Sequence, residues 1–277
     1  MLVSGSIGIT ILKKDNKIII LMADDHSSKK YCQQYDFDSK DHTNVRNFLK
    51  KELDSGNQIL LEEVERDNFH LEELWTESPH TQDLKNFFLS EDNITGIDIR
   101  PYLIPFSWEI LETDEKLGHI SIKDYLSNLE QFFRLKGKFY EEIFYPIIKK
   151  ITIYNRGIEL NLKYIKLKYF KIKKDSSINF NMKYYFTNKK EVLFDISQLC
   201  DEIMELYTLI NSFIDSNKTI IHTGLYHSTN ILKWLIEIYK FKVIYKNGIN
   251  NIHGLSNNVE SSSCVYLPGL DKFGFKD

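Results

Sequence analysis

The sequence predicts an α/β protein: a mostly parallel central sheet flanked by helices, with a helical insertion between the N-terminal strands and the last strands. Apolar β-branched runs alternate with segments of helical spacing before residue 101 and again after residue 217. This alternation favours parallel strand pairing. The stretch in between shows mainly helical spacing. We therefore expect one domain over residues 1–277, with 101–217 as the insertion and 247–277 as an irregular C-terminal tail.

The first elements follow from local signals. Two strand-like runs, Leu2–Leu12 and Lys17–Met22, are separated by turn residues, which predicts a hairpin at one edge of the sheet. Apolar residues recur at helical spacing from Asn44 to Leu53, and Ser55-Gly56 ends that helix before the apolar run Gln58–Leu61. A helix near 71–89 and a strand around Gly96 complete the N-terminal part.

The middle of the chain changes character after Pro101. Residues 107–112 and 121–148 have helical spacing, the latter with an aromatic stripe typical of a core-facing helix. Residues 151–186 leave two alternatives open, because Ile158, Leu160 and Leu162 alternate like a strand while helical spacing can be drawn through the same stretch. The remaining expected elements are a helix over 196–214, a strand over 218–221, a helix over 228–239 and a strand over 242–245.

Composition limits the classes of function. The chain has 42% hydrophobic and 27% charged residues, an ordinary balance for a soluble globular protein. A net charge of −3 gives no general attraction for nucleic acid or anionic membranes. The one basic and aromatic stretch, Lys163–Lys174, is more typical of a solvated helix face than of a phosphate-binding surface. We expect no membrane partner and regard nucleic acid as an unlikely one.

The chain shows no signal peptide at Met1–Thr10 and no apolar run near the ~20 residues that span a bilayer, which favours a cytoplasmic location. Three widely spaced cysteines are expected to be reduced thiols. Ala23 is the only alanine and lysine greatly outnumbers arginine. This bias is typical of AT-rich genomes, including those of giant viruses, in which case the location would be the host cytoplasm or the virion.

Polar side chains that can do chemistry follow four of the apolar runs, at the points where strands would end. In an open α/β sheet, ligands bind in the crevice outside the carboxyl ends of the strands. We therefore expect one site assembled at this edge from distant segments. Its candidate residues are Asp24, Asp25 and His26 after the first run, Glu62 after the second, Asp98 and Arg100 after the third, and His222 and His227 after the fourth.

Each candidate also has a structural explanation. Asp24 with His26 can bind a metal or orient a general base, but such residues are also common in turns. Glu62 can be an acid favoured at a helix N-terminus, and Asp98 with Arg100 can be an ion pair. His227 would begin a helix after Gly224, where the helix dipole favours the neutral imidazole that a ligand or base requires.

These residues resemble four motifs of the erythromycin esterase, ChaN-like and TraB/TIKI superfamily. Ala23-Asp24-Asp25-His26 is similar to a Gly-Glu-x-His motif in spacing and histidine, with Ala23 and Asp24 replacing its glycine and glutamate. Ile59-Leu60-Leu61-Glu62 resembles an apolar strand ending in glutamate. Gly96-Ile97-Asp98 resembles a Gly-x-Asp segment, and Gly224-Leu225-Tyr226-His227 a Gly-x-x-His segment. The likeness covers residues 2–100 and 215–245.

The resemblance implies a site formed by Asp24, His26, Glu62 and His227. These residues would be ligands of a divalent metal (Mn, Co or Zn) in the TIKI-like branch, or acid and base groups in the esterase-like branch. Haem, the ChaN-like variant, is the less favoured cofactor. Asp25, Asp98 and Arg100 would contact the substrate.

Two functions remain in competition. The first is a hydrolase of an ester or amide bond in a small molecule or peptide, with a metal-dependent or histidine-based mechanism. The alternative is a non-catalytic binding or structural protein, such as a viral component, that retains the fold. A site filled by its own side chains would favour the alternative.

Overall fold

We describe the protein from a computed structural model. The described residues are 1–26, 42–64, 75–91, 93–104, 107, 122–134, 137, 139–176, 190–214, 217–252 and 263–269. Contacts divide the chain into two compact units. The first comprises Met1–Glu63, Glu77–Gly96 and Asp215–Asp277, and the second comprises Val64–Thr76 and Ile97–Ile214. The predicted helix over 107–112 lies outside the described residues except for Ser107.

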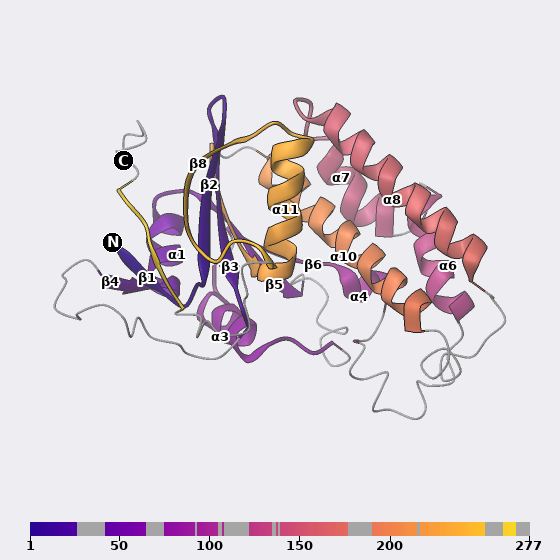
Figure 1. The fold of residues 1–277 in the computed structure, drawn as a ribbon, viewed down its shortest axis with the longest axis horizontal. Helices are drawn as coiled ribbons and strands as arrows, with labels where there is room; N and C mark the ends of the chain where they lie inside the picture. Colours follow the sequence, from indigo (N-terminus) through magenta and orange to yellow (C-terminus); the bar gives the residue numbers. More distant parts are fainter. Residues whose placement is uncertain are drawn as a thin grey trace. The chain divides into compact units, whose positions relative to one another are not determined.

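The fold class is α/β, as predicted. A six-stranded sheet has the order β6-β5-β7-β3-β2-β8, and its β5, β7 and β3 strands run parallel. β2 pairs antiparallel with both β3 and β8 (Figure 1). The strands are β2 (Gly8–Lys14), β3 (Lys17–Asp24), β5 (Gln58–Val64), β6 (Ile94–Asp98), β7 (Lys218–Gly224) and β8 (Lys242–Gly248).

The central strands are apolar on both faces, because each face is covered. Ile18, Ile20 and Met22 of β3 belong to a core cluster that also contains Phe48 and Leu84. These two residues come from α1 (Val45–Asp54) and α3 (Pro79–Phe87). The opposite face of β3 and β7 contacts α11 (Leu225–Glu237). Successive side chains of a strand alternate between faces, so β3 contributes to both layers.

A second, three-stranded sheet has the order β4-β1-β9. It joins β1 (Leu2–Ser4) in parallel to β4 (His42–Asn44) and antiparallel to β9 (Cys264–Tyr266). The expected tail is therefore irregular only in part, since β9 is a paired strand. Cys264 on β9 is disulfide-bonded, whereas Cys200 is a free buried thiol. The prediction of reduced thiols is correct for Cys200 and wrong for Cys264, and Cys32 lies outside the described residues.

The predicted N-terminal hairpin exists between β2 and β3, but it does not form the edge of the sheet. β8 pairs with β2 on its outer side and takes that edge position. The first run also divides, because Gly5 at φ +92° turns the chain between β1 and β2. Local sequence spacing predicted the hairpin of β2 and β3, but it predicted neither this division of the first run nor the distant pairing with β8.

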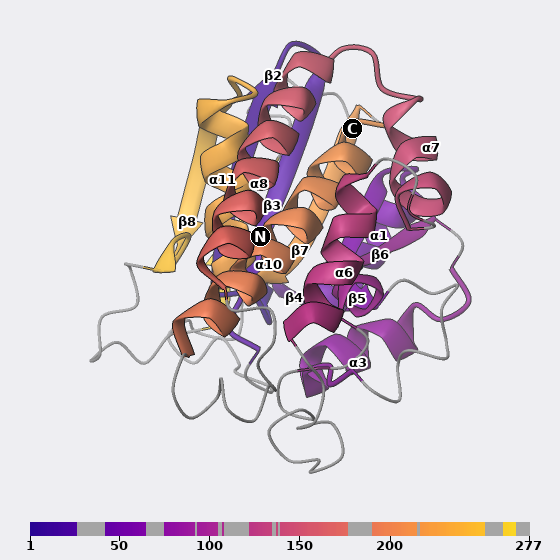
Figure 2. The ribbon, with the colours of Figure 1, turned by 90° about the vertical axis from the view of Figure 1, so that its right-hand side faces the viewer.

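The described helices of the second unit pack against one another. Its long helices are α8 (Asn155–Asp175) and α10 (Lys190–Ser212), which lie side by side with α6 (Ile122–Phe133) next to α8 (Figure 2). Shorter segments are α4 (Arg100–Leu103), the π-helix η2 (Tyr140–Phe144) and α7 (Tyr145–Ile148). Of residues 151–186, for which the sequence left strand and helix as alternatives, Asn155–Asp175 are helical. No helix in the described ranges is long and apolar enough to cross a membrane.

Candidate functional site

Register brings the carboxyl ends of three parallel strands together in the first unit. β7 lies between β5 and β3, with Asp24 of β3 opposite Gly224 of β7. On the other side of β7, Leu61 of β5 is opposite His222, which places Glu62 level with the end of β7. The polar residues that follow these apolar runs therefore meet at one edge, although up to 200 positions separate them in the chain.

Asp24 lies buried between two imidazoles. Its Oδ2 is 3.4 Å from Nδ1 of His26 and 3.8 Å from Nε2 of His80. His80 is in the first turn of α3, which begins at Pro79 because the hydroxyl of Ser78 accepts the backbone N–H of Thr81. The helix start thus fixes a histidine against the carboxylate.

His26 lies across the end of β7. Its backbone is left-handed at φ +55°, which is uncommon outside glycine and costs about 1–2 kcal/mol. A Cβ on Gly224 would stand only 2.3 Å from Nε2 of His26, so the imidazole occupies space that any other residue at 224 would fill. The side chain of His26 is 40% exposed. The other side chains gathered at this edge are less exposed: Asp24, Glu62, His80, His222 and His227.

Glu62 lies on the other side of this imidazole. Its Oε2 accepts the backbone N–H of Gly224 at 2.6 Å and is 3.9 Å from Nε2 of His26. Its Oε1 is 3.5 Å from Nε2 of His227, in the first turn of α11. Strand alternation directs Asp24 and Glu62 to opposite faces of the sheet, and His26 is placed between them.

A second pair of imidazoles adjoins Asp24. The rings of His80 and His222 have centroids 5.4 Å apart. The Nε2 atoms of both rings are buried without a hydrogen-bond partner, which is costly for a polar atom. Burial lowers the pKa of His222 to about 4, so this ring is neutral at physiological pH.

Charge and hydrogen bonding shift the pKa values of the two groups that face each other. Burial alone would raise the pKa of Asp24, but the hydrogen bond with His26 and the charges of His222, His80 and His26 lower it overall. The same hydrogen bond raises the pKa of His26, against an opposing effect of burial and with support from the charge of Glu62. His26 is thereby shifted toward the imidazolium form and Asp24 toward the carboxylate.

The structure brings together five of the predicted site residues: Asp24, His26, Glu62, His222 and His227. Asp25 is half-buried between Asp24 and His26 in the chain. Asp98 and Arg100 belong to the second unit.

In that unit Arg100 donates to Asp98 at 2.8 and 2.7 Å and to Asp201 at 3.0 Å, and its guanidinium lies 5.5 Å from the ring of Trp75. The indole N–H of Trp75 also donates to Asp98. The ion pair considered from the sequence is therefore present.

Sequence reasoning missed His80. The expected helix near 71–89 placed this residue in mid-helix, whereas α3 begins at Pro79. The signal was present, because Ser78-Pro79 is a typical helix start, with a capping hydroxyl followed by proline at the first position. A helix that follows a parallel strand begins near the carboxyl edge of the sheet, and that rule would have placed His80 beside Asp24.

The donor set is one that suits both acid–base chemistry and a divalent cation. Four imidazoles and two carboxylates suit Zn, Mn or Co, for which nitrogen and oxygen are common ligands. Neighbouring donors of a tetrahedral site lie about 3.4 Å apart, given metal–ligand bonds of about 2.1 Å. Distances here are 3.4–3.9 Å. Within the described residues, however, no three such side chains already stand in a geometry that would hold a metal ion.

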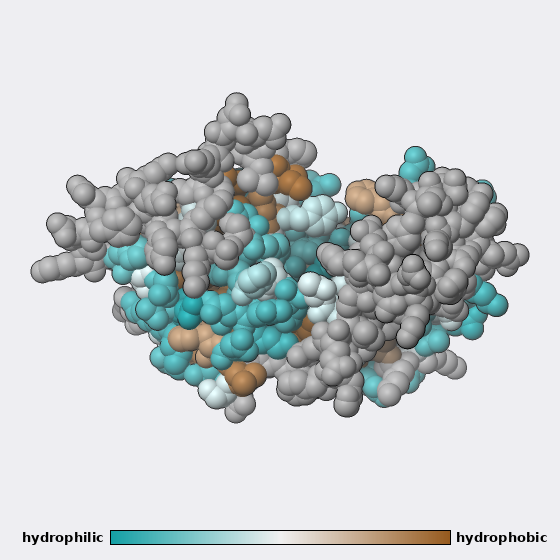
Figure 3. All heavy atoms as spheres, turned by 90° about the horizontal axis from the view of Figure 1, so that it is seen from below, coloured by the Kyte–Doolittle hydropathy of each residue, from teal (hydrophilic) through white to brown (hydrophobic). Residues whose placement is uncertain are grey.

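The surface around α3 is polar. Figure 3 shows that the described residues on the lower side of the molecule, where Figure 1 places α3, are mostly hydrophilic with small apolar areas between them.

Comparison of the chain with protein-family models, curated proteins and solved structures finds no match. The superfamily resemblance therefore stays a prediction that rests on the motifs themselves.

Proposed function

We propose that the protein is a hydrolase of ester or amide bonds, with His26 as its general base. The observation that carries this proposal is the position of His26: an accessible imidazole at the end of the central strand, between two largely buried carboxylates. A base oriented by a carboxylate is a recurrent arrangement in enzymes that activate water or a hydroxyl group. The expected substrate is a small molecule or a peptide.

His26 would transfer one proton in each half of the reaction. The tautomer with its proton on Nδ1 suits donation toward Asp24 and leaves the lone pair of Nε2 to accept a proton from water. The resulting hydroxide attacks the carbonyl carbon, and the imidazolium then gives the proton to the departing alkoxide or amine. Bond formation to the hydroxide oxygen and cleavage of the C–O or C–N bond thus leave His26 neutral again.

Asp24 and Glu62 would support this base from two sides. Asp24 fixes the ring orientation and stabilises the imidazolium, as its effect on the pKa of His26 indicates. Glu62 is itself positioned by the N–H of Gly224 and by His227, so its carboxylate cannot easily rotate away. We assign Asp24 and the Glu62–His227 pair as positioning residues and His26 as the catalytic residue.

A divalent cation is a second component that one observation favours. The buried Nε2 atoms of His80 and His222 have no hydrogen-bond partner, and Asp24 lies within 3.8 Å of the first of them. Asp24, His26, Glu62 and His227 would hold a Mn, Co or Zn ion, with His80 and His222 as additional nitrogen donors beside Asp24. When bound, such an ion lowers the pKa of a coordinated water and supplies hydroxide at neutral pH.

Hydrolysis is tested with purified full-length protein on a series of p-nitrophenyl esters and on a peptide mixture analysed by mass spectrometry. Wild type is expected to hydrolyse at least one class above background. His26→Gln is expected to lower that rate by about 10²–10⁴-fold, the usual contribution of a general base. His42→Gln is the matched control, because His42 lies on β4 of the small sheet. It should keep the wild-type rate.

Two outcomes would reject the hydrolase. One is an absence of hydrolysis in both substrate classes with and without added Mn²⁺, Co²⁺ or Zn²⁺, which favours the non-catalytic alternative. The other is a His26→Gln variant as active as His42→Gln.

The metal is tested separately by thermal shift and elemental analysis. An increase in Tm on adding the metal that Glu62→Gln abolishes and His42→Gln retains supports the metal site. Equal increases in Tm in wild type and both variants exclude this site.

A further inference from the structure

The second unit contains an apolar cavity between α6, η2 and α8 with a volume of about 430 Å³. This size lies within the range of small-molecule binding sites. Phe132, Phe133 and Tyr140 line one wall, and residues of α8 line the other. The α8 wall consists of Glu159, Leu162, Lys163, Lys166, Leu167 and Phe170.

The aromatic wall is firmly held. The ring of Phe132 is fully buried and packs edge-on against the rings of Phe133, Tyr140 and Phe144. By contrast, Leu167 and Phe170 on α8 are more than half exposed. Large apolar side chains exposed together beside a cavity are typical of a binding site.

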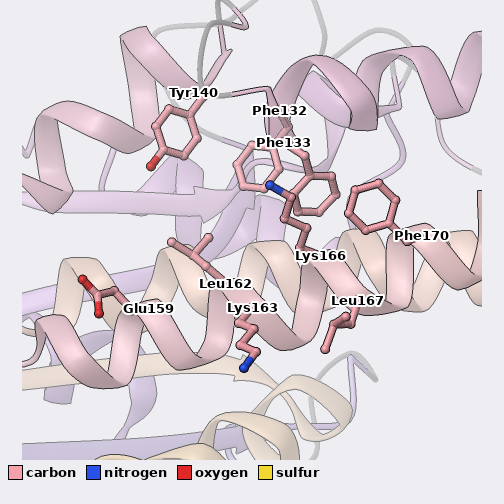
Figure 4. A pocket seen from close by; sticks show the side chains of 9 residues that line it. All are labelled: Phe132, Phe133, Tyr140, Glu159, Leu162, Lys163, Lys166, Leu167 and Phe170. Carbon is pink, nitrogen blue, oxygen red and sulfur yellow. The ribbon is translucent and has the colours of Figure 1, made fainter.

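Lys166 brings a positive charge to this apolar surface. Figure 4 shows its side chain reaching from α8 toward Phe133, whereas the ammonium of Lys163 points away from the rings. Two other lysines of α8 have carboxylate partners, Lys168 with Glu202 at 2.7 Å and Lys173 with Glu130 at 3.1 Å. Among the described residues, Lys166 has no ion-pair partner.

The charges and shape of the lining point to one kind of ligand. The α8 wall runs from Glu159 to Phe170, about 16 Å at 1.5 Å per residue, which suits a linear chain better than a compact ring system. Glu159 at one end disfavours an anion there, and Lys166 favours one along the wall. We propose that this cavity binds a free fatty acid, with its carboxylate beside Lys166 and its alkyl chain against Phe132 and Phe133.

Decanoate, measured by isothermal titration calorimetry with the full-length protein, is the probe. Wild type should bind it saturably, while decyltrimethylammonium, which has the same chain and the opposite charge, should not bind. Lys166→Glu should weaken decanoate binding by at least about tenfold, because like charges then face each other. Lys171→Glu is the matched control: it makes the same charge change on an exposed position of α8 outside the lining and should bind as wild type does.

Three results would overturn the proposal: no saturable binding of decanoate, equal binding of the two probes, or equal affinities for the two variants. Leu162→Trp fills the cavity from α8 without changing charge and should also reduce binding. Co-sedimentation with phosphatidylglycerol vesicles that decanoate does not reduce would assign Lys166 to a lipid surface instead. These outcomes do not depend on the hydrolase proposal, because no residue of the lining belongs to the first unit.

Discussion

Replacing Gly224 with alanine tests whether His26 is held at the end of β7. The added methyl would stand 2.3 Å from Nε2, 3.0 Å from Cε1 and 3.2 Å from Cδ2 of His26, where ordinary contact begins at 3.4 Å. The backbone of Gly224 at φ −54° and ψ 151° suits alanine, so strain there is not expected. The imidazole is the far end of a side chain and therefore moves, by about 1 Å.

Gly224→Ala is expected to lower activity strongly and stability only slightly. A displacement of about 1 Å at a catalytic group can reduce the rate about a hundredfold, so we expect a fall of that size in kcat/KM on the ester found active. Alanine is a poorer N-cap than glycine, which costs about 0.5–1 kcal/mol of the free energy of unfolding. The Tm should fall by about 2–4 °C, as expected for a chain of this size.

Proton NMR titration of His26 in chelator-treated protein gives a readout that needs no substrate. The pKa of His26 is raised by its hydrogen bond with Asp24. In Gly224→Ala this bond is lost, and the pKa should return toward 6.5.

Gly56→Ala is the matched control. Gly56 has φ +79° and an open environment, so alanine there costs stability through backbone strain and leaves His26 in place. If Gly224→Ala keeps both the wild-type rate and the wild-type pKa of His26, the imidazole does not occupy the space above Gly224 and the proposed site is wrong.

Four further predictions concern stability. The pKa of His222 is lowered to about 4 in the folded protein, so acidification from pH 6.5 to 4 protonates this residue in the unfolded chain first and should lower the free energy of unfolding by roughly 3 kcal/mol. In urea denaturation, His222→Gln should lose less of its free energy of unfolding between pH 6.5 and 4 than the wild type does. A loss equal to that of the wild type would contradict the lowered pKa of His222. The raised pKa of His26 has the opposite sign: its stabilisation is present below pH 6.5 and is lost as pH rises through the folded pKa, a dependence that His26→Gln should remove. Arg100→Met leaves the buried carboxylate of Asp98 without its cation and should cost about 3–5 kcal/mol in thermal unfolding, whereas a cost below 1 kcal/mol would show the pair to be dispensable. Ser78→Ala removes the cap of α3 and should cost about 1 kcal/mol, as should Asn44→Ala at α1, but only Ser78→Ala should reduce hydrolysis, because Ser78 lies 3.4 Å from Nδ1 of His26.

Local signals predicted most elements of the first unit. The helix at Val45–Asp54 follows the cap Asn44, whose side chain accepts the N–H of Asn47, and ends at Ser55. Such signals act over a few residues and are therefore visible in the sequence. The pairing of β8 with β2 and of β9 with β1 depends on segments more than 200 residues apart, which no local pattern specifies.

The burial of residues in α8 explains why the sequence pattern of this stretch fitted both a strand and a helix. Ile158, Leu160 and Leu162 alternate, but only Ile158 is fully buried, while Leu160 is exposed. The buried face continues through Asn161 and Ile165 at helical spacing. A polar residue on the buried face and an apolar one on the exposed face conceal the period of 3.6 residues.

The sequence predicted those residues of the candidate site that lie at or near the ends of strands. Asp24 and Glu62 lie at or near the carboxyl ends of β3 and β5, and His227 lies in the first turn after β7, so the rule for open sheets predicted that they meet at one edge. His80 does not follow its strand directly, and its place depends on where α3 begins. The left-handed backbone of His26 has no local signal in the sequence, and its imidazole lies against Gly224, which is distant in the chain.

The chain order has a consequence for folding during synthesis. β7 is inserted between β5 and β3, yet it is made last of the three, and Ile18 has Lys218 as its register partner. At about 5–20 residues per second, ribosomes need about 10–40 s for that interval, during which the facing edges of β3 and β5 lack their partner. Unpaired edges can pair with other chains. We expect newly made protein to require chaperone protection until β7 emerges, and His26 to reach its place only at that last step.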